Sequence, residues 1–315
     1  MLRDPLPWDE FREVARTAEE TGYAALFVPE IAGREAFSTL SGLASATTSV
    51  LLGTGVVPMA ARRPDVTAMA AATVQGLSGG RLVLGLGAGH QPPGMTPGPL
   101  DRLREYVHVV RGALEGRETT APTFGVRGFQ PELTPDPPPP VWIAALGDRM
   151  VELAGEIADG VLLNWCTPQR VDDARAKITA AAGRAGRDPG AITVAVYVRA
   201  CVGPPAGVAL SALKEMTGRY SSLPNYLRQF ERMGLGDGAR RAAKAFEAGH
   251  ADDVPGELVD ALCVRGTRDA WTERATAMRA AGADLVLCYP VAALDPFSTV
   301  LGTAIACAPD PAVER

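Results

Sequence analysis

The sequence predicts an α/β fold built on a parallel sheet, and three observations support this. Short apolar runs alternate along the chain with segments of helical periodicity. One run, Leu82–Leu86 (LVLGL), is continuously apolar, which is typical of a strand buried on both faces. Two successive runs end in glycine-rich stretches one helix apart, at 53–55 and 87–89. In a parallel sheet both ends open on the same face, where ligands bind.

The alternation resolves into seven expected strands, each followed by a helix or a helical segment. They are residues 23–28, 50–56, 82–87, 141–145, 161–164, 192–201 and 283–289. With right-handed crossovers, this is one strand short of an eight-stranded barrel. The absent strand should precede the first helix, yet residues 1–8 hold two prolines and no apolar alternation. Either the first strand is missing or residues 1–7 form it poorly, and a gap would expose strand edges on both sides.

The helices of the first half are predicted from apolar residues that recur at helical spacing. Pro64 can open one of them, because its missing N–H is not needed at the first helical position. Glycines close two, at Gly22 and at Gly79–Gly80. The expected ranges are 9–21, 37–47, 64 to the glycine pair at 79–80, and 100–114.

The second half begins with a Pro-rich loop over residues 116–140, where four consecutive prolines fix an extended geometry. Two helices open at threonine caps, Thr167 and Thr267. Residues 204–262 are largely helical without a convincing strand, so we interpret them as an insertion within a single domain of residues 1–315. The expected helices are 148–158, 167 to about 183, 267–281 and a terminal helix from Pro296.

Composition places the chain among soluble globular enzymes. Apolar residues make up 47% and charged residues 21%, and the net charge of −5 comes without a basic run. These values argue against nucleic acid or an anionic membrane as a partner. No segment is apolar over about 18 residues, and Met1–Pro5 lead into no signal-peptide core. We therefore expect a cytoplasmic protein.

Cysteine and histidine spacing indicates neither disulfides nor a metal site. The five cysteines are scattered, without a C-x-x-C pair, which is typical of reduced thiols in the core of a cytosolic protein. The three histidines lie far apart in the sequence and match no metal-binding spacing. The GLGAG stretch lacks the spacing of a dinucleotide fingerprint and its later acidic residue, which argues against a Rossmann fold.

Several motifs together resemble the bacterial luciferase-like superfamily. They are LGTGVVP at 52–58, LSGGRLVLGLGAG at 77–89, GYAALFVPEIAGREAF at 22–37, AALGDRMVELAGEIADGVLLNW at 144–165 and GADLVLCYP at 282–290. The PE-x-x-GR-E-AF and AALG…LAGE-x-ADG patterns most resemble the branch that uses coenzyme F420, an 8-hydroxy-5-deazaflavin. Relatives elsewhere in the superfamily use FMN.

The resemblance implies an eight-stranded (β/α) TIM barrel with the cofactor in its C-terminal mouth. It implies an insertion after the seventh strand, which residues 204–262 fit. It also implies a bulge with a cis peptide behind the cofactor ring, at Gly53, Thr54, Gly55 and Val56; the alternative there is an ordinary strand-to-loop turn. Because homodimers are common among relatives, a homodimer with a small-molecule substrate is expected.

Two residues at expected strand ends are candidates for proton transfer. Glu30 follows the 23–28 strand, where many family members carry a histidine. Its alternative role is that of a structural carboxylate paired with Arg34 or Arg62. His90 follows the glycine-rich end of the 82–87 strand, in a region where family members supply an acid or base. Its alternative role is that of a solvated loop histidine.

The turn Ala145, Leu146 and Gly147 is the best candidate for binding the cofactor phosphate. It leads directly into a helix, whose free N–H groups and positive dipole end would face the ligand. The alternative is a plain turn between strand and helix. Ala88 and Gly89 would let the backbone approach the same cofactor.

Asn164 and Trp165 end the next expected strand and complete the candidate cofactor site. Trp165 either flanks the cofactor or packs at the rim of the barrel. The site residues thus come from the ends of five strands, as in other barrels whose ligands bind at the C-terminal face.

Three hypotheses for function follow. The first is an oxidoreductase that transfers a hydride between coenzyme F420 and a small organic substrate, with the protein binding the ring and excluding water. The second keeps the fold but uses FMN and oxygen, as a monooxygenase. The third is a barrel that has lost catalysis and acts as a binding protein. The missing strand and the missing histidine favour it, whereas the intact glycine-rich mouth argues against it.

Overall fold

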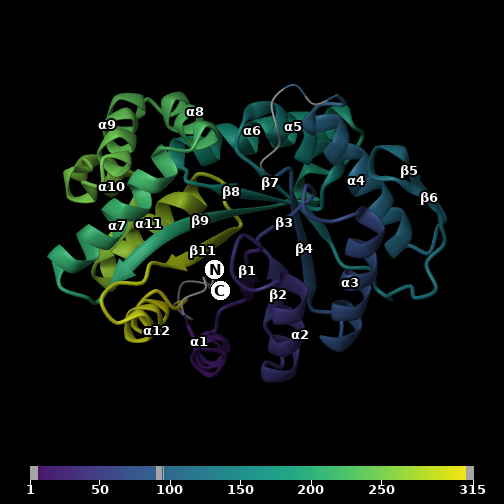
Figure 1. Ribbon diagram of the computed structural model, residues 1–315, viewed down its shortest axis with the longest axis horizontal. Helices are drawn as coiled ribbons and strands as arrows, with labels where there is room; N and C mark the ends of the chain where they lie inside the picture. The colour runs from purple at the N-terminus through teal and green to yellow at the C-terminus, as the bar shows by residue number, and fades with distance from the viewer. Residues whose placement is uncertain (1–5, 90–93, 95, 310–315) are drawn as a thin grey trace.

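The computed structural model describes residues 6–89, 94 and 96–309. Its centre is a curled parallel sheet with helices around it, a TIM-barrel arrangement that confirms the predicted fold class (Figure 1). From one edge, the strands are β1 (Ala25–Val28), β2 (Leu51–Thr54), β4 (Leu82–Gly87), β7 (Val141–Ala145), β8 (Gly160–Asn164), β9 (Thr193–Val202) and then β11 (Leu285–Pro290), which pairs with β9. These are the seven strands expected from the sequence.

Four shorter strands were not expected from the sequence. β3 (Val57–Pro58) continues the path of β2 beside β4, and β10 (Cys263–Gly266) pairs with the far end of β9. In the Pro-rich stretch interpreted as a loop, β5 (Thr119–Ala121) and β6 (Val126–Phe129) form an antiparallel hairpin. The expectation of an extended loop over all of residues 116–140 was therefore wrong. The hairpin forms because Ala121 and Val126 bury their side chains with Val109 in a small hydrophobic cluster.

The expected helices are confirmed to within one residue or a few at each end. Those around the barrel are α1 (Trp8–Glu20), α2 (Ala36–Ala46), α3 (Pro64–Leu77), α4 (Pro99–Leu114), α5 (Asp148–Ile157), α6 (Pro168–Arg184), α11 (Arg268–Ala280) and α12 (Pro296–Ala306). Thr167 and Thr267 cap α6 and α11, as predicted. Short 3-10 turns lie at Pro122–Phe124, Pro189–Ala191 and Ala251–Asp253.

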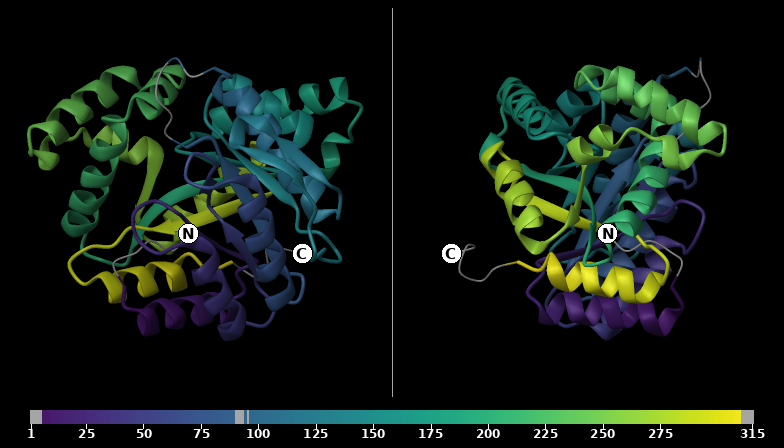
Figure 2. Two further views of the ribbon diagram at one scale, coloured as in Figure 1. Left: turned by 45° about the vertical axis from the view of Figure 1, so that its right-hand side comes forward. Right: turned by 90° about the vertical axis from the view of Figure 1, so that its left-hand side faces the viewer.

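The insertion between β9 and β10 is a bundle of short helices at one end of the sheet, above its C-terminal edge (Figures 1 and 2). Its helices are α7 (Ala206–Ser221), α8 (Pro224–Arg232), α9 (Gly236–Glu247) and α10 (Gly256–Leu262). They share a hydrophobic cluster with residues of the barrel strands, including Trp165 and Tyr289. The insertion is therefore packed onto the mouth of the barrel.

The sheet is open between β1 and β11, since the described residues show no pairing between these two strands. A cavity of about 540 Å³ lies there, lined by β1 at Ala25–Phe27 and by β11 at Leu285–Cys288. α1 and α12 lie side by side across this end of the molecule (Figure 2). The sequence left open whether residues 1–7 form a first strand. Leu6 and Pro7 form none, and residues 1–5 lie outside the described residues.

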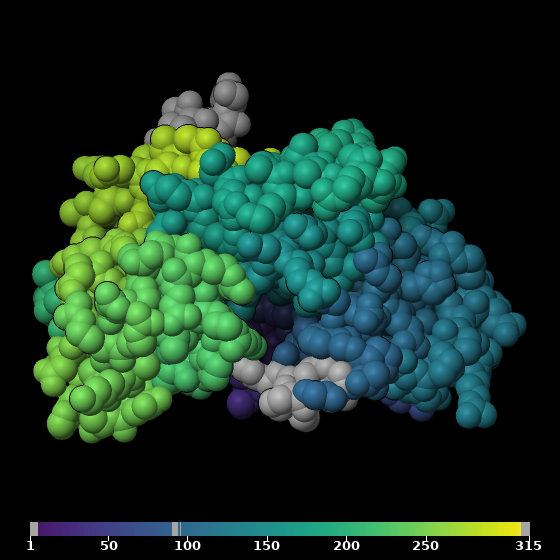
Figure 3. Space-filling model, turned by 90° about the horizontal axis from the view of Figure 1, so that it is seen from above, coloured from purple at the N-terminus to yellow at the C-terminus, as the bar shows by residue number. Residues whose placement is uncertain are grey.

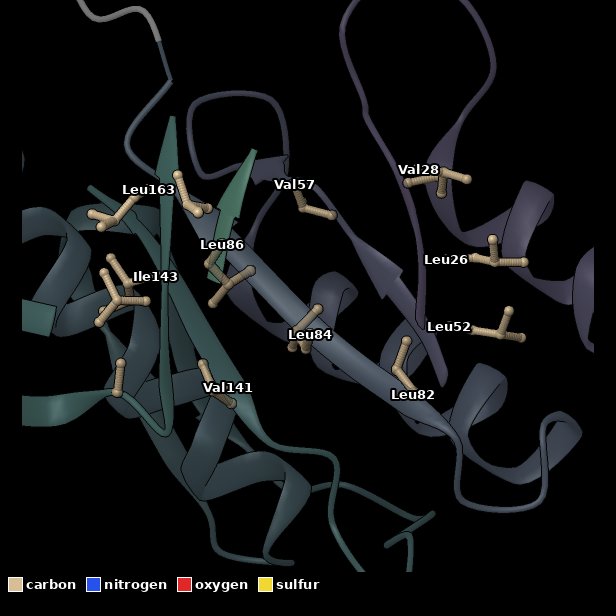
Figure 4. Close-up of a cluster of buried hydrophobic side chains, with 14 of the residues drawn as sticks. Leu26, Val28, Leu52, Val57, Leu82, Leu84, Leu86, Val141, Ile143 and Leu163 are labelled. Atoms are coloured by element: carbon tan, nitrogen blue, oxygen red, sulfur yellow. The ribbon is translucent and has the colours of Figure 1, made fainter. Parts of the chain in front are cut away.

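Alternation along the strands divides the core into two layers. One set of side chains faces outward to the helices, including Leu26, Leu52, Leu84 and Ile143 (Figure 4). The other set faces the barrel interior: Phe27, Val83, Trp142, Leu162, Ala195, Tyr197 and Leu287. Because the period of a strand is two, Asn164, Arg199 and Tyr289 continue the interior rows of β8, β9 and β11 toward the C-terminal ends. These three side chains therefore belong to the floor of the mouth.

Candidate active site at the barrel mouth

The glycine-rich end of β2 forms a backbone bulge over β4. The peptide bond between Gly55 and Val56 is cis, as the family resemblance implies. The buried Thr54 hydroxyl donates to the Gly85 carbonyl at 2.7 Å and accepts from the Gly85 N–H at 2.8 Å. A Cβ on Gly85 would lie 2.1 Å from the Thr54 carbonyl oxygen. The bulge therefore needs a bare backbone at Gly85.

A tyrosine hydroxyl lies directly against the bulge. A Cβ on Gly55 would lie 2.2 Å from the Tyr197 Oη, so glycine is required at this contact. The hydroxyl is buried and has no hydrogen-bond partner among the described residues. Burial raises the pKa of Tyr197, which therefore stays a neutral phenol. A donor without a partner at this position is available to a ligand.

Glu30 lies just beyond the end of β1, in an ion pair with Arg62. Its Oε1 lies 2.8 Å from Arg62 Nε, and its Oε2 lies 3.1 Å from Arg62 Nη2 and accepts from the Ala36 N–H at 3.1 Å. Glu35 contacts the same guanidinium and caps α2 through the N–H groups of Phe37 and Ser38. Of the two pairings expected for a structural carboxylate, the one with Arg62 is present.

The hydrogen bonds at this corner also set the ionisation of Glu35. Burial alone would raise the pKa of Glu35, but the hydrogen bonds from Ser38 and Phe37 and the charge of Arg62 lower it overall. Glu35 is therefore an anion, and it holds Arg62 together with Glu30 beside the end of β1. The role of Glu30 in proton transfer stays a prediction, and both of its oxygens are engaged in this geometry.

Three other predicted residues follow β4: Ala88, Gly89 and His90. His90 lies outside the described residues. Gly89 adopts a φ of +68°, and a Cβ there would lie 3.0 Å from the Pro58 Cβ. A glycine is needed because only it adopts this conformation freely while the chain passes so close to β3. Ala88 and Gly89 thus bring the end of β4 beside the bulge.

The predicted phosphate turn joins β7 to α5, as expected. Gly147 precedes the first helical residue, Asp148, and its carbonyl accepts from Met150 and Val151 at 3.0 Å. The Arg170 guanidinium donates to the Leu146 carbonyl at 2.9 Å and lies 2.9 Å from Asp148. These contacts fix the turn and leave the helix N-terminus at the mouth.

An arginine from the insertion lies against this turn. A Cβ on Gly147 would be 3.6 Å from the Arg232 Nη2, at the end of α8. Arg232 has no ion pair among the described residues, and its side chain is exposed. A cation beside a helix N-terminus faces a positive dipole end, so an anion between the two would be stabilised by both. Sequence reasoning missed Arg232, which is 85 residues from the turn along the chain.

Asn164 and Trp165 lie beneath the insertion. Asn164 donates to the Tyr226 hydroxyl at 3.0 Å and accepts from Arg199. Trp165 adopts a φ of 54° and is buried against Tyr220 at 4.9 Å between ring centroids. These are the contacts of the packing alternative, and the role of Trp165 in cofactor binding stays a prediction.

A cavity of about 1450 Å³ opens beside the mouth. It lies between α7, the loop after β1 and the loop after β11, and Tyr289 forms part of its wall. Seen from above, the molecule is hollowed between the insertion and the blue β4–α4 region, with purple N-terminal residues at the base (Figure 3). The space is large enough for a drug-sized ligand or cofactor.

The described residues hold no group of three or more His, Cys, Asp or Glu side chains arranged to bind a metal ion. Within the same residues, no helix has the length and apolar character needed to cross a bilayer. The five cysteines are free and buried.

Comparisons with known proteins agree with this architecture. A family model described as luciferase-like monooxygenase matches residues 1–285. A 5,10-methylenetetrahydromethanopterin reductase of Methanolobus tindarius is 32% identical over 81% of this chain and 82% of its own length. A protein of Mycobacterium tuberculosis, provisionally named a coenzyme F420-dependent oxidoreductase, is 30% identical over 89% and 90% of the two chains.

Solved structures share the fold at lower identity. The coenzyme F420 dependent tetrahydromethanopterin reductase of Methanopyrus kandleri matches with a TM-score of 0.81 and 23% identity, over 96% of this chain and 95% of its own. The oxygenating constituent of a diketocamphane monooxygenase of Pseudomonas putida, in complex with FMN, matches with a TM-score of 0.71 and 16% identity, over 99% and 96%. The fold thus occurs both in a coenzyme F420 dependent reductase and in a monooxygenase that binds FMN.

Proposed function

Because the chain belongs to the luciferase-like monooxygenase family, we propose that it is an oxidoreductase that transfers a hydride between coenzyme F420 and a small organic substrate. The observation that carries the choice of coenzyme is the match with a relative named for coenzyme F420 over nine-tenths of both chains. The mouth supplies the binding surface that this function needs.

The residues present fit such a coenzyme at both of its ends. The bulge at Gly53, Thr54, Gly55 and Val56 offers a backbone surface, with the unpartnered Tyr197 hydroxyl against it. The turn at Ala145–Gly147, with the Arg232 guanidinium facing it, suits a phosphate. When bound, the deazaflavin ring supplies a carbon that accepts or releases a hydride.

The chain's own residues would hold the ring, exclude water and move a proton. The bulge and the Ala88–Gly89 backbone would hold one face of the ring, and the insertion would cover the mouth from solvent. Glu30 and His90 are the proposed groups for proton transfer at the substrate. Glu30 would act in this way only when Arg62 moves, because Arg62 now engages both of its oxygens.

The choice of coenzyme is tested by direct titration. Purified protein is mixed separately with oxidised coenzyme F420 and with FMN, following tryptophan quenching and coenzyme fluorescence. We expect binding of coenzyme F420 with FMN at least tenfold weaker. Preference for FMN would redirect the work to oxygen chemistry, and binding of neither would contradict the proposed function and favour a non-catalytic barrel.

We also propose that the protein is a homodimer that packs through α3. Val66, Met69 and Leu77 are 41%, 49% and 60% exposed, and helical spacing places them along one side of α3. An apolar stripe of this kind is self-complementary across a two-fold axis. Sedimentation velocity should show a dimer that Met69→Glu converts to a monomer, whereas a monomeric wild type would refute this.

A further inference from the structure

Arg199 is a cation buried in the interior layer of the barrel. It lies on β9, in register with Tyr289 of β11, and only 1% of the residue is exposed. Alternation along β9 points it inward above Tyr197, the residue whose hydroxyl touches the bulge. The guanidinium is therefore at the floor of the mouth, on the side that the insertion covers.

Aromatic rings enclose this guanidinium. Its central carbon lies 4.3 Å from the ring centroid of Trp165, 4.7 Å from that of Tyr289 and 5.2 Å from that of Tyr220. One terminal nitrogen of the Arg199 guanidinium donates to the side-chain carbonyl oxygen of Asn164. The Nε of Arg199 and the indole N–H of Trp165 are buried with no partner among the described residues. Two buried donors, one on the guanidinium and one on a ring that encloses it, are thus without a partner among the described residues.

No described carboxylate balances the charge, since none lies within 4.0 Å of the guanidinium. The ionisable side chains around it are tyrosines and cysteines: Cys166, Tyr197, Tyr220, Tyr226, Cys263 and Tyr289. Burial raises the pKa of Cys166 and of Cys263 to about 11 and that of Tyr226 to about 12.

Cys166, Tyr197, Tyr226 and Cys263, whose pKa values are raised by burial, are therefore neutral near pH 7. Cation–π contacts and one amide offset only part of the cost of taking a guanidinium out of water. A buried cation that keeps a free donor is the arrangement expected where a ligand brings the counter-charge. Tyr289, one of the rings that enclose the guanidinium, also forms part of the wall of the 1450 Å³ cavity.

We propose that Arg199 is an anion receptor, which takes a planar, delocalised oxyanion of the bound ligand as its counter-charge, with the Trp165 indole N–H as a second donor. The oxyanion has two possible sources. One is the ring of the 8-hydroxydeazaflavin, whose acidic hydroxyl is conjugated with the ring carbonyls, and this source rests on the proposed function. The other is a carboxylate of the substrate.

The first experiment follows the ionisation of bound, oxidised coenzyme F420 by its visible absorbance between pH 5 and 9. If the ring is the source, the wild type lowers the pKa of the chromophore relative to free coenzyme. Arg199→Met should then shift the ionisation equilibrium about tenfold or more toward the protonated form, and Arg199→Lys should retain most of the effect. Arg228→Gln, which removes an exposed cation of α8, should change nothing.

The second experiment uses benzoate and the protein without coenzyme. If a carboxylate is the source, benzoate quenches tryptophan fluorescence in the wild type, and Arg199→Met weakens its binding about tenfold. A purely structural role for Arg199 would change the melting temperature but neither the chromophore equilibrium nor benzoate affinity. Should Arg199→Met fail to fold, the comparison of bound with free chromophore and benzoate binding by the wild type still decide the question.

The outcomes separate this inference from the proposed function. If coenzyme F420 does not bind to the wild type, the proposed function is contradicted. Benzoate binding then tests by itself whether Arg199 is an anion receptor. An unchanged chromophore together with no benzoate binding overturns the inference and leaves Arg199 as part of the packing between barrel and insertion.

Discussion

The two sides of the barrel mouth differ in whether their buried polar groups have hydrogen-bond partners. On the β1–β4 side, the polar side chains described above have partners: Glu30 holds Arg62, and Thr54 bonds both backbone groups of Gly85. On the β8–β11 side, Trp165, Tyr197 and Arg199 keep buried polar atoms without partners among the described residues. A cluster whose polar groups all have hydrogen-bond partners stabilises the fold around the site. Buried donors without partners indicate where polar groups of a ligand would bind.

The largest expected effect comes from a substitution that disrupts the bulge on the β1–β4 side. Gly85→Ala would force a Cβ to within 2.1 Å of the Thr54 carbonyl oxygen, which is backbone and cannot rotate away. We expect the free energy of unfolding to fall by about 3 kcal/mol or more, together with loss of coenzyme binding. Urea unfolding followed by circular dichroism measures this change.

Gly302→Ala is the matched control for that substitution. Gly302 lies in α12 with open space at the Cβ position, so alanine should stabilise the protein by up to about 1 kcal/mol. Equal responses of the two variants would show that the bulge tolerates a side chain and that the β1–β4 side is not a rigid support.

The next largest effect is expected from substituting Arg232, the cation that the insertion places beside the proposed phosphate turn. Arg232→Glu places an anion at the N-terminus of α5, where the proposed phosphate binds. Coenzyme affinity should fall about tenfold to a hundredfold, because a charge-assisted hydrogen bond is replaced by repulsion. Arg228→Glu makes the same charge change one helical turn earlier on α8, and isothermal titration calorimetry should show near wild-type affinity for it. Equal losses in both variants would indicate only a long-range effect of net charge.

A smaller effect is expected from opening the ion pair on the supported side. Glu30→Gln leaves Arg62 with Glu35 as its remaining carboxylate, so the free energy of unfolding should fall by about 1–2 kcal/mol. A double-mutant cycle with Arg62→Gln isolates the pair. Unchanged stability combined with a large loss of turnover would instead assign Glu30 to catalysis, and the contrast between the two sides would no longer hold.

The smallest effect concerns Glu19, which is held by backbone N–H groups far from the mouth. Burial tends to raise its pKa, but hydrogen bonds from Ser49, Val50 and Thr48 outweigh this and lower the pKa to about 2. Because the pKa is lowered on folding, the ionised Glu19 carboxylate stabilises the fold fully above the unfolded value of about 4.5. This stabilisation is lost as the pH falls toward 2. Glu19→Gln should therefore cost below about 1 kcal/mol at pH 7 and nothing near pH 2. Glu20→Gln, its exposed neighbour, should show no such pH dependence in parallel urea titrations.

The sequence was sufficient for the elements whose signals are local. Strand and helix periodicity located the seven barrel strands and the helices around them, whereas the bulge at Gly53–Val56 was expected only from the family resemblance. The β5–β6 hairpin was missed because prolines dominate the stretch and the cluster that stabilises it includes Val109 from α4. β10 was missed because four residues at the end of a helical insertion carry little periodicity.

The candidate site was predicted only where it is contiguous in sequence. The turn at Ala145–Gly147 is found from a strand followed by a helix, but Arg232 reaches it across the insertion. Arg199 gave one local signal, a charge at an inward-facing position of an otherwise apolar strand, TVAVYVRACV. Its enclosure by Trp165 and Tyr220 depends on how the insertion folds back, which strand periodicity does not encode.

The insertion also has a consequence for the timing of binding. α7 and α8 share one hydrophobic cluster, yet Tyr220 covers the floor of the mouth while Arg232 faces the phosphate turn. A coenzyme that touches both places would be released by a single movement of this bundle. Its dissociation would then be one kinetic event, with a residence time set by the docking of the insertion and not by the strength of either contact alone.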